Sequence, residues 1–389
     1  MRTKTTFLFC LVLFFLMGRQ TLFAQDLSLF KEVSDSSYLS SPAYSSGNKY
    51  QKDALLFLDL VTDTHPYFIR AERRAAWLAQ KEALLNQCVT IQTDEAFVDA
   101  LNNYLGSLYD GHCFLATLNR LLEGRQMQEP SLENRSLSAE TETAPILQRH
   151  DLPYVYQLFP EMRLCYLQFN QCRDSPDKPF ATFLDEMFGR MEADGIRSLV
   201  VDVQYNGGGD SRLCNQLLDH LCPWNKMKDY TVYVRFSDWL KAYYPQIADL
   251  QEAWEKSGHS EELYFEPDEE ENDEPEDFQQ PEIFDGQVVF IMGKQTYSSA
   301  GILLTLARDN HIGTIIGTTS RFSPSHYGDI LPFRLPNTGV LGAVPFKYFA
   351  RPDETLAEEP DMKPDIEVNL DDMESSWRYI CENYGAGKS

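Results

Sequence analysis

Two segments of this chain repeat one order of features: an apolar run, a turn of small residues and the start of a helix. Residues 199–210 contain three consecutive glycines in the turn, and residues 288–301 contain two consecutive serines. A short apolar run bounded by turn residues is typical of a strand that is buried on both faces. Buried strands that alternate with helices form sheets with parallel strands. We therefore predict an α/β core.

Further apolar runs extend this alternation. They predict strands at 154–158, 163–169, 198–203, 288–292 and 314–317, and helices at 180–191, 211–221 and 299–308.

Upstream of these elements the apolar residues follow a different pattern. Apolar residues recur at helical spacing from Gln51 to Leu121, which predicts a small helical region. The polar stretch 126–150 is typical of a linker. We therefore predict a helical N-terminal domain with its linker over residues 25–150 and the α/β core over 151–389.

The N-terminus has the composition of a targeting segment. Arg2 and Lys4 precede an apolar run from Phe7 to Met17, which is too short to span a bilayer as a helix. We predict a signal peptide over residues 1–24, cleaved before Gln25. The mature chain is then exported to the periplasm or the cell exterior without a membrane anchor, and an uncleaved anchor is the alternative.

The chain is acidic, with a formal charge of -25 from 59 acidic and 34 basic residues. This charge argues against binding to nucleic acid or to an anionic membrane surface. An insertion near 258–283 carries eleven acidic residues and no basic one between Glu261 and Asp277. We predict a solvated, disordered loop there. A calcium site is the alternative, but the EF-hand spacing is missing, and we predict no metal or other cofactor.

Seven cysteines follow the predicted signal peptide, an odd number without a CxxC pair or the ligand spacing of a zinc site. We expect mostly buried thiols. Cys165 with Cys172, or Cys214 with Cys222, are candidate disulfides.

The two small-residue turns carry the residues suited to chemistry. Glycines at the entry to a helix expose N–H groups that can bind an anion, either a phosphate or the oxyanion of an acyl-transfer intermediate. The two glycine patterns that bind phosphates, GxGxxG and GxxxxGK(S/T), are both missing. The oxyanion is therefore the favoured ligand of this turn. In the second turn, Ser298 is either the N-cap of the following helix or a nucleophile.

Taken in order, these segments resemble the serine peptidases of the C-terminal processing (tail-specific) and tricorn type. The matching residues are the strand that ends in Asn206-Gly-Gly-Gly, the serine turn, and the closing strand Pro364-Asp-Ile-Glu-Val368. The resemblance extends from about Tyr154 to Val368. It implies a crotonase-like β/β/α superhelix, protein or peptide substrates and no cofactor.

The resemblance also implies roles for single residues. Ser298 matches the nucleophile, and Ser299 is the second choice for that role. The N–H groups of Ser299 and Gly208 match the oxyanion donors, with Gly207 close behind. Glu359 matches the family's glutamate, which orients the imidazole of a histidine base, and Glu358 is one register away.

Two family features are missing. The processing peptidases carry a lysine base about twenty-five residues after the serine, where this chain has Phe322 to His326. The stretch from Cys113 to Tyr154 is also too short for the usual PDZ module, so recognition of substrate tails is left open. His112, in the segment Leu-Tyr-Asp-Gly-His, matches the histidine of the tricorn branch and is the predicted base, with His326 as its rival. A catalytically silent binding protein on the same scaffold is the alternative function.

Overall fold

The computed structural model describes residues 29–33, 42–108, 110–122, 149–256, 258, 263–266, 280–370 and 373–385. The predicted signal peptide and most of the predicted linker lie outside these residues. Among the helices of the described ranges, none has the length and apolar character needed to cross a membrane.

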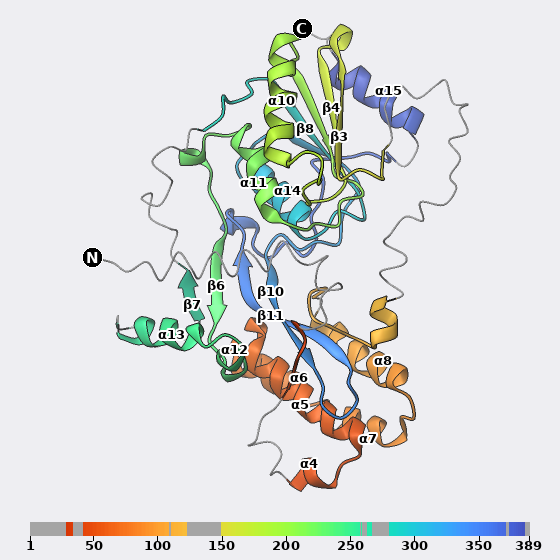
Figure 1. Cartoon of the computed structure of the whole chain (residues 1–389), viewed down its shortest axis with the longest axis vertical. Coiled ribbons are helices and arrows are strands. Elements are labelled where there is room, and N and C mark those ends of the chain that lie inside the picture. The colour runs from red at the N-terminus through yellow and green to blue at the C-terminus, as the bar shows by residue number, and fades with distance from the viewer. Residues whose placement is uncertain are drawn as a thin grey trace.

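A six-stranded sheet forms the centre of the upper lobe in Figure 1, with the strand order β12-β9-β8-β5-β4-β3. Neighbours from β4 to β12 pair in parallel, and β3 and β4 form an antiparallel hairpin. The predicted strands and the α/β core are therefore confirmed. The bounds are Tyr154–Phe159 for β3, Leu164–Phe169 for β4, Ser198–Asp202 for β5, Gln287–Met292 for β8, Thr314–Gly317 for β9 and Ile366–Glu367 for β12.

Helices cover both faces of this sheet because alternate strand residues point to opposite faces. In β5, Leu199 and Val201 share a core with α10 (Phe180–Ala193), α11 (Ser211–Asp219) and α14 (Ser299–Asp309). Val200 points the other way, into a core that includes Ile380 of α15 (Met373–Tyr384). Burial on both faces explains why these strands are continuous apolar runs in the sequence.

A second six-stranded sheet has the order β1-β10-β11-β6-β7, with β2 also paired to β11. Its strands β10 and β11 form a long hairpin that runs from the upper lobe down to the N-terminal helices (Figure 1). The bounds are Lys31–Glu32 for β1, Phe114–Ala116 for β2, Thr231–Arg235 for β6, Leu263–Glu266 for β7, His326–Arg334 for β10 and Leu341–Ala350 for β11.

Strand β7 corrects part of the prediction for the acidic insertion. Residues 263–266 were expected in a disordered loop, but they pair in antiparallel fashion with β6. The sequence Leu-Tyr-Phe inside the acidic run explains the strand, because aromatic and large apolar residues suit a pleated sheet. Residues 267–279 lie outside the described part of the chain.

The N-terminal region is helical, as predicted, but β2 interrupts it at residues 114–116, and residues 118–122 are helical again. The helices are α4 (Pro42–Ser46), α5 (Lys49–Thr64), α6 (Ala71–Leu78), α7 (Lys81–Thr90) and α8 (Asp94–Leu105). Two more helices, α12 (Asp238–Tyr243) and α13 (Gln246–Lys256), follow β6. Short 3-10 helices lie at Pro66–Ile69 (η2), Gly106–Leu108 (η3), Pro160–Met162 (η4), Trp224–Lys226 (η5) and Glu354–Leu356 (η6).

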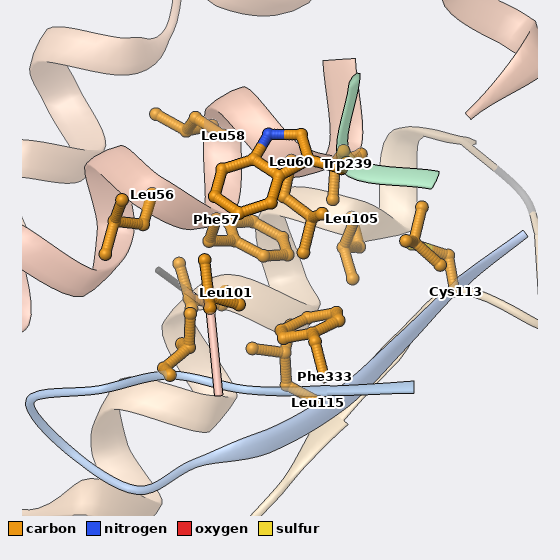
Figure 2. Close-up of a cluster of buried hydrophobic side chains, with 14 of the residues drawn as sticks. Leu56, Phe57, Leu58, Leu60, Leu101, Leu105, Cys113, Leu115, Trp239 and Phe333 are labelled. Atoms are coloured by element: carbon orange, nitrogen blue, oxygen red, sulfur yellow. The ribbon is translucent and has the colours of Figure 1, made fainter. Parts of the chain in front are cut away.

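The N-terminal helices share their core with the second sheet. Figure 2 shows side chains of α5 and α8 packed with Trp239 of α12, Leu115 of β2 and Phe333 of β10. Burying one large apolar side chain contributes about 1.5–3 kcal/mol, so this shared core holds the helices on the β10–β11 hairpin.

The seven cysteines after the predicted signal peptide are all free thiols, and five of them are buried. Neither candidate disulfide is present. The Sγ atom of Cys172 lies 3.5 Å from that of Cys214, so each candidate pair has one member that faces a different partner. Cys165 lies within β4, in the core beneath the helices.

Candidate active site

The two small-residue turns lie side by side, because β5 and β8 are parallel neighbours and their carboxyl ends meet at one edge of the sheet. Hydrogen bonds join the turns. The Tyr297 N–H donates to the Asn206 carbonyl at 3.0 Å, and the Thr296 hydroxyl donates to the Val203 carbonyl at 2.8 Å. Thr296 and Asn206 are both fully buried, so the turns are fixed to one another.

Ser298 occupies the N-cap position of α14, but its side chain makes no capping hydrogen bond. Its backbone has φ 52° and ψ -127°, a left-handed conformation that is unusual for a residue with a side chain. Such a conformation costs on the order of 1–3 kcal/mol and persists where the surroundings impose it. A sharp strand-to-helix turn of this kind is the setting of nucleophilic serines in hydrolases.

Gly208 is the residue of the glycine turn that approaches this serine. Its φ is +100°, and a Cβ at this position would lie 2.7 Å from the Ser298 Cβ and 2.9 Å from the Ser299 nitrogen. Only glycine adopts this positive φ without strain and also avoids these short contacts. The Gly208 N–H donates to the Asn206 side-chain oxygen at 2.9 Å, so this predicted oxyanion donor already has an acceptor.

Ser299 connects the two turns through its side chain. Its hydroxyl donates to the Gly209 carbonyl at 2.8 Å. Its own N–H begins α14 and, among the described residues, has no hydrogen-bond acceptor. Of the two predicted oxyanion donors, this N–H is therefore the one that is available without rearrangement.

His112 reaches the site from the segment between η3 and β2. It is buried, and its imidazole stacks on the ring of Tyr297 with 5.5 Å between centroids. A Cβ on Gly111 would lie 2.2 Å from the Tyr297 hydroxyl oxygen, so glycine is required for this approach. Burial raises the pKa of Tyr297 to about 12, which keeps the phenol neutral. The structure thus brings His112 to the residue that precedes Ser298.

Asp110 contacts His112 directly. Its Oδ1 accepts the main-chain N–H of His112 at 2.9 Å and lies 3.4 Å from Nδ1 of the ring. Its Oδ2 lies 3.0 Å from Nε2 of His65. Burial alone would raise the pKa of the Asp110 carboxyl, but the hydrogen bonds and charges of His112 and His65 outweigh it and hold this pKa well below its usual range. Asp110 is therefore an ionised acceptor for both histidines.

His326, the rival base, lies beside His112 with 6.1 Å between ring centroids. It stacks on Phe349 at 4.9 Å, and its Nδ1 is 3.3 Å from the Pro324 carbonyl oxygen. Burial and the neighbouring His112 lower the pKa of His326 to about 3. A histidine with so low a pKa is a weak base near neutral pH.

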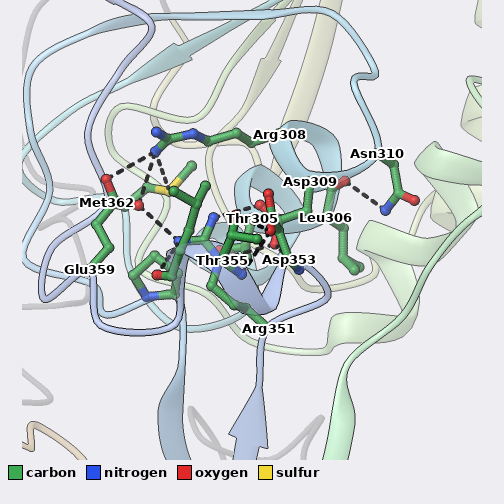
Figure 3. A network of polar contacts seen from close by, with 12 residues as sticks. Thr305, Leu306, Arg308, Asp309, Asn310, Arg351, Asp353, Thr355, Glu359 and Met362 are labelled. Carbon is green, nitrogen blue, oxygen red and sulfur yellow. Dashed lines mark hydrogen bonds and ion pairs between the residues drawn. The ribbon is translucent and has the colours of Figure 1, made fainter.

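The structure does not bring Glu359 to His112. The Glu359 carboxylate instead lies 2.8 Å from Arg351 and 3.3 Å from Arg308, in the network drawn in Figure 3. The side chain of Arg351 is fully buried, which explains the need for carboxylates around it. Glu358 is exposed.

Two residues of this site were missed in the sequence. Asp110 was part of the quoted Asp-Gly-His segment, and an acidic residue two positions before a candidate base is a signal that could have found it. His65 is the C-cap of α5. No local pattern indicates that it also meets Asp110, because the two residues come together only through the tertiary fold.

The sequence profile of peptidase family S41 matches residues 163–368, more than half of the chain. The chain belongs to peptidase family S41. The matched range runs from β4 to β12 and contains both small-residue turns, so the resemblance on which the site prediction depended is confirmed. No curated protein matches the sequence.

Solved structures show the same fold at low sequence identity. A protein of Parabacteroides merdae, provisionally assigned as a peptidase, is 15% identical with a TM-score of 0.51, covering 82% of this chain and 90% of its own. A lipoprotein of Streptococcus agalactiae is 10% identical with a TM-score of 0.50, covering 86% and 96%. A photosystem II D1 C-terminal processing protease is 11% identical with a TM-score of 0.46, covering 87% and 98%. The first two structures, with TM-scores of 0.51 and 0.50, show that this S41 chain shares their fold over most of its length.

Proposed function

We propose that this S41 chain is an active serine peptidase that cleaves peptide bonds through an acyl-enzyme on Ser298, with His112 as the general base. The observation that carries the proposal is the meeting of three segments. Gly208 lies against the Ser298 side chain, and His112 stacks on the adjacent Tyr297.

The reaction begins when Ser298 Oγ attacks the carbonyl carbon of the scissile amide and its proton passes to His112 Nε2. The C–N bond then breaks, the same proton goes to the leaving amine, and the acyl group stays on Ser298. Water then attacks this ester while His112 takes a proton from it, the bond between the acyl carbon and Ser298 Oγ breaks, and His112 returns the proton to Ser298 Oγ. Asp110 stabilises the imidazolium and keeps the proton of the neutral ring on Nδ1, the role first expected of Glu359.

The oxyanion is held by the two turns. The Ser299 N–H is the first donor. The second is an N–H of the glycine turn, where Gly208 has to exchange the Asn206 oxygen for the substrate oxygen, or Gly207 supplies the group. Two such donors stabilise charge that develops in the transition state, and each contributes on the order of 3 kcal/mol.

We further propose that the enzyme is exported and acts on proteins or peptides in the periplasm or outside the cell. The basis for export is the apolar N-terminal segment with its preceding Arg2 and Lys4. A histidine in place of a lysine base favours the tricorn-like branch of the family over the tail-specific branch.

A fluorophosphonate probe tests the proposal because it labels only an activated serine. The wild-type protein and the control variant Ser323→Ala are expected to be labelled, and Ser298→Ala is expected to show no labelling. Peptide mapping by mass spectrometry locates the label, and a peptide library then reads out cleavage. Label on Ser299 would move the nucleophile by one residue. A folded wild-type protein that takes no label would favour the silent binding protein.

A further inference from the structure

His65 is a buried histidine that the proposed mechanism does not use. It lies between α5 and η2 and has no exposed side-chain surface. Its ring packs against Tyr327 at 4.5 Å, and its carbonyl oxygen accepts from Arg235 at 2.7 Å. Arg235 also binds the Thr62 carbonyl at 2.9 Å, so β6 clamps the end of α5 in place. The backbone around His65 is thus held by Arg235, and the ring is buried against Tyr327.

The hydrogen bonds of the ring fix its tautomer. The main-chain N–H of Tyr67 donates to His65 Nδ1 at 3.1 Å, so this nitrogen is an acceptor and carries no proton. The proton of the neutral ring is therefore on Nε2, which lies 3.0 Å from Asp110 Oδ2. His65 is a donor aimed at the carboxylate.

The two oxygens of the Asp110 carboxylate therefore face two different histidines. Oδ2 faces His65, and Oδ1 faces the main-chain N–H and Nδ1 of His112. The Asp110 side chain is only 4% exposed, so water does not replace a lost partner easily. A rotation of the carboxylate would break contacts on both sides.

We infer that His65 is a positioning residue, which holds the Asp110 carboxylate in the orientation that keeps the His112 proton on Nδ1. His112 Nε2 is then left without a proton and can accept the one from Ser298. This inference rests on the proposed function, in which His112 is the base. With His65 in this role, the site includes the end of α5. His65 acts there through Asp110 and not by contact with the reacting atoms.

The competing explanation is that His65 only caps the chain between α5 and η2 through Tyr67. Two substitutions separate the explanations. Asparagine places an oxygen near the position of Nδ1 and can keep the contact with the Tyr67 N–H, but it does not reach Asp110. Glutamine places its amide near Nε2 and can keep the donor to Asp110. His220→Asn is the matched control, since His220 is a buried histidine that stacks on Phe188 in the other core.

The first readout is independent of activity. The ¹⁵N chemical shifts of the ring identify the tautomer of neutral His112. We expect the Nδ1–H form in the wild-type protein, in His65→Gln and in His220→Asn. In His65→Asn we expect a mixture of both tautomers, with the fold checked by circular dichroism. An unchanged Nδ1–H tautomer in folded His65→Asn would overturn the inference, even if the wild-type protein took no fluorophosphonate label.

The second readout is the rate of fluorophosphonate labelling against pH. His65→Asn should label about 10- to 100-fold more slowly, as expected for a misplaced base, and His65→Gln should stay within about threefold of the wild type. A slow His65→Gln beside a normal His65→Asn would assign His65 to the cap alone. If His65→Asn does not fold, a shifted His112 tautomer in His65→Gln would contradict the inference, and an unshifted one would support it.

Discussion

The imidazole of His112 stacks on the phenol ring of Tyr297 with an angle of 29° between the planes. His112 belongs to the N-terminal half of the chain, and Tyr297 belongs to the turn between β8 and α14. The site is thus assembled from two parts of the fold, which the β10–β11 hairpin joins because it contributes to both large cores. Anything that shifts the helices against the α/β core should therefore change catalysis before it changes secondary structure.

Gly111→Ala tests this contact. The new methyl group would overlap the Tyr297 hydroxyl, so His112 and Tyr297 have to separate. A misplacement on the order of 1 Å can cost about 100-fold in rate. We expect a loss of this size in the rate of fluorophosphonate labelling, with little change in the circular dichroism spectrum. Gly106→Ala is the control, because a Cβ there meets no atom within 4 Å. Equal labelling rates for the two variants would contradict the role of the contact.

Gly208→Ala tests the glycine turn. Both the positive φ of +100° and the distance of 2.7 Å to the Ser298 Cβ oppose a side chain here. If the turn aims an oxyanion donor, turnover should fall by an amount equivalent to about 3 kcal/mol in activation free energy. Gly195→Ala is the control for backbone strain alone, because Gly195 has φ +62° but no atom within 4 Å of its Cβ position. It should lose stability and keep its turnover. A folded Gly208→Ala with unchanged turnover would remove this turn from the site.

The elements of the α/β core could be predicted from the sequence because parallel strands buried on both faces leave continuous apolar runs, as in residues 198–203. The β10–β11 hairpin was missed. Its strands carry polar residues such as Asp329 and Lys347, which lie buried as an ion pair at 3.1 Å and interrupt the apolar pattern. An ion pair between neighbouring strands leaves no periodic signal in either strand alone.

The residues of the candidate site have a local signal in the sequence only where they are close to a recognisable turn. Ser298 and Gly208 follow strands, and His112 follows a helix end, so each has a local signal. The partner of His112 depends on tertiary packing. The family pattern points to Glu359, but in this chain buried Arg351 takes that carboxylate, and Asp110 faces the histidine instead.

Asp110→Asn and Glu359→Gln distinguish the two carboxylates. Asparagine at 110 leaves the shape intact but removes the charge that fixes the tautomer of His112, and turnover should fall by a factor on the order of 10²–10⁴. Glutamine at 359 weakens the neutralisation of buried Arg351, which should lower the free energy of unfolding by roughly 1–3 kcal/mol. Its turnover should stay within severalfold of the wild type. Steady-state kinetics and urea unfolding measure both effects. The reverse pattern, with Glu359→Gln inactive and Asp110→Asn active, would restore Glu359 as the orienting group.

His326→Phe tests the rival base and the pH dependence of stability together. The pKa of His326 is about 3 in the folded protein, and an unfolded histidine has a pKa of about 6.5. Between these values the unfolded chain binds more protons than the native chain. The contribution of neutral, buried His326 is therefore complete above pH 6.5 and is lost as the pH falls toward 3, by up to about 1.4 kcal/mol per pH unit. Phenylalanine can keep the packing against Phe349 and does not titrate. Urea unfolding at pH 7, 6, 5 and 4 should give a shallower loss of stability for His326→Phe than for the wild type. An identical slope would show that His326 is not held neutral.

The same variant, His326→Phe, also tests the rival base. It should keep most of its fluorophosphonate labelling if His112 is the base. A loss of labelling as large as that of His112→Ala would assign the role of the base to His326.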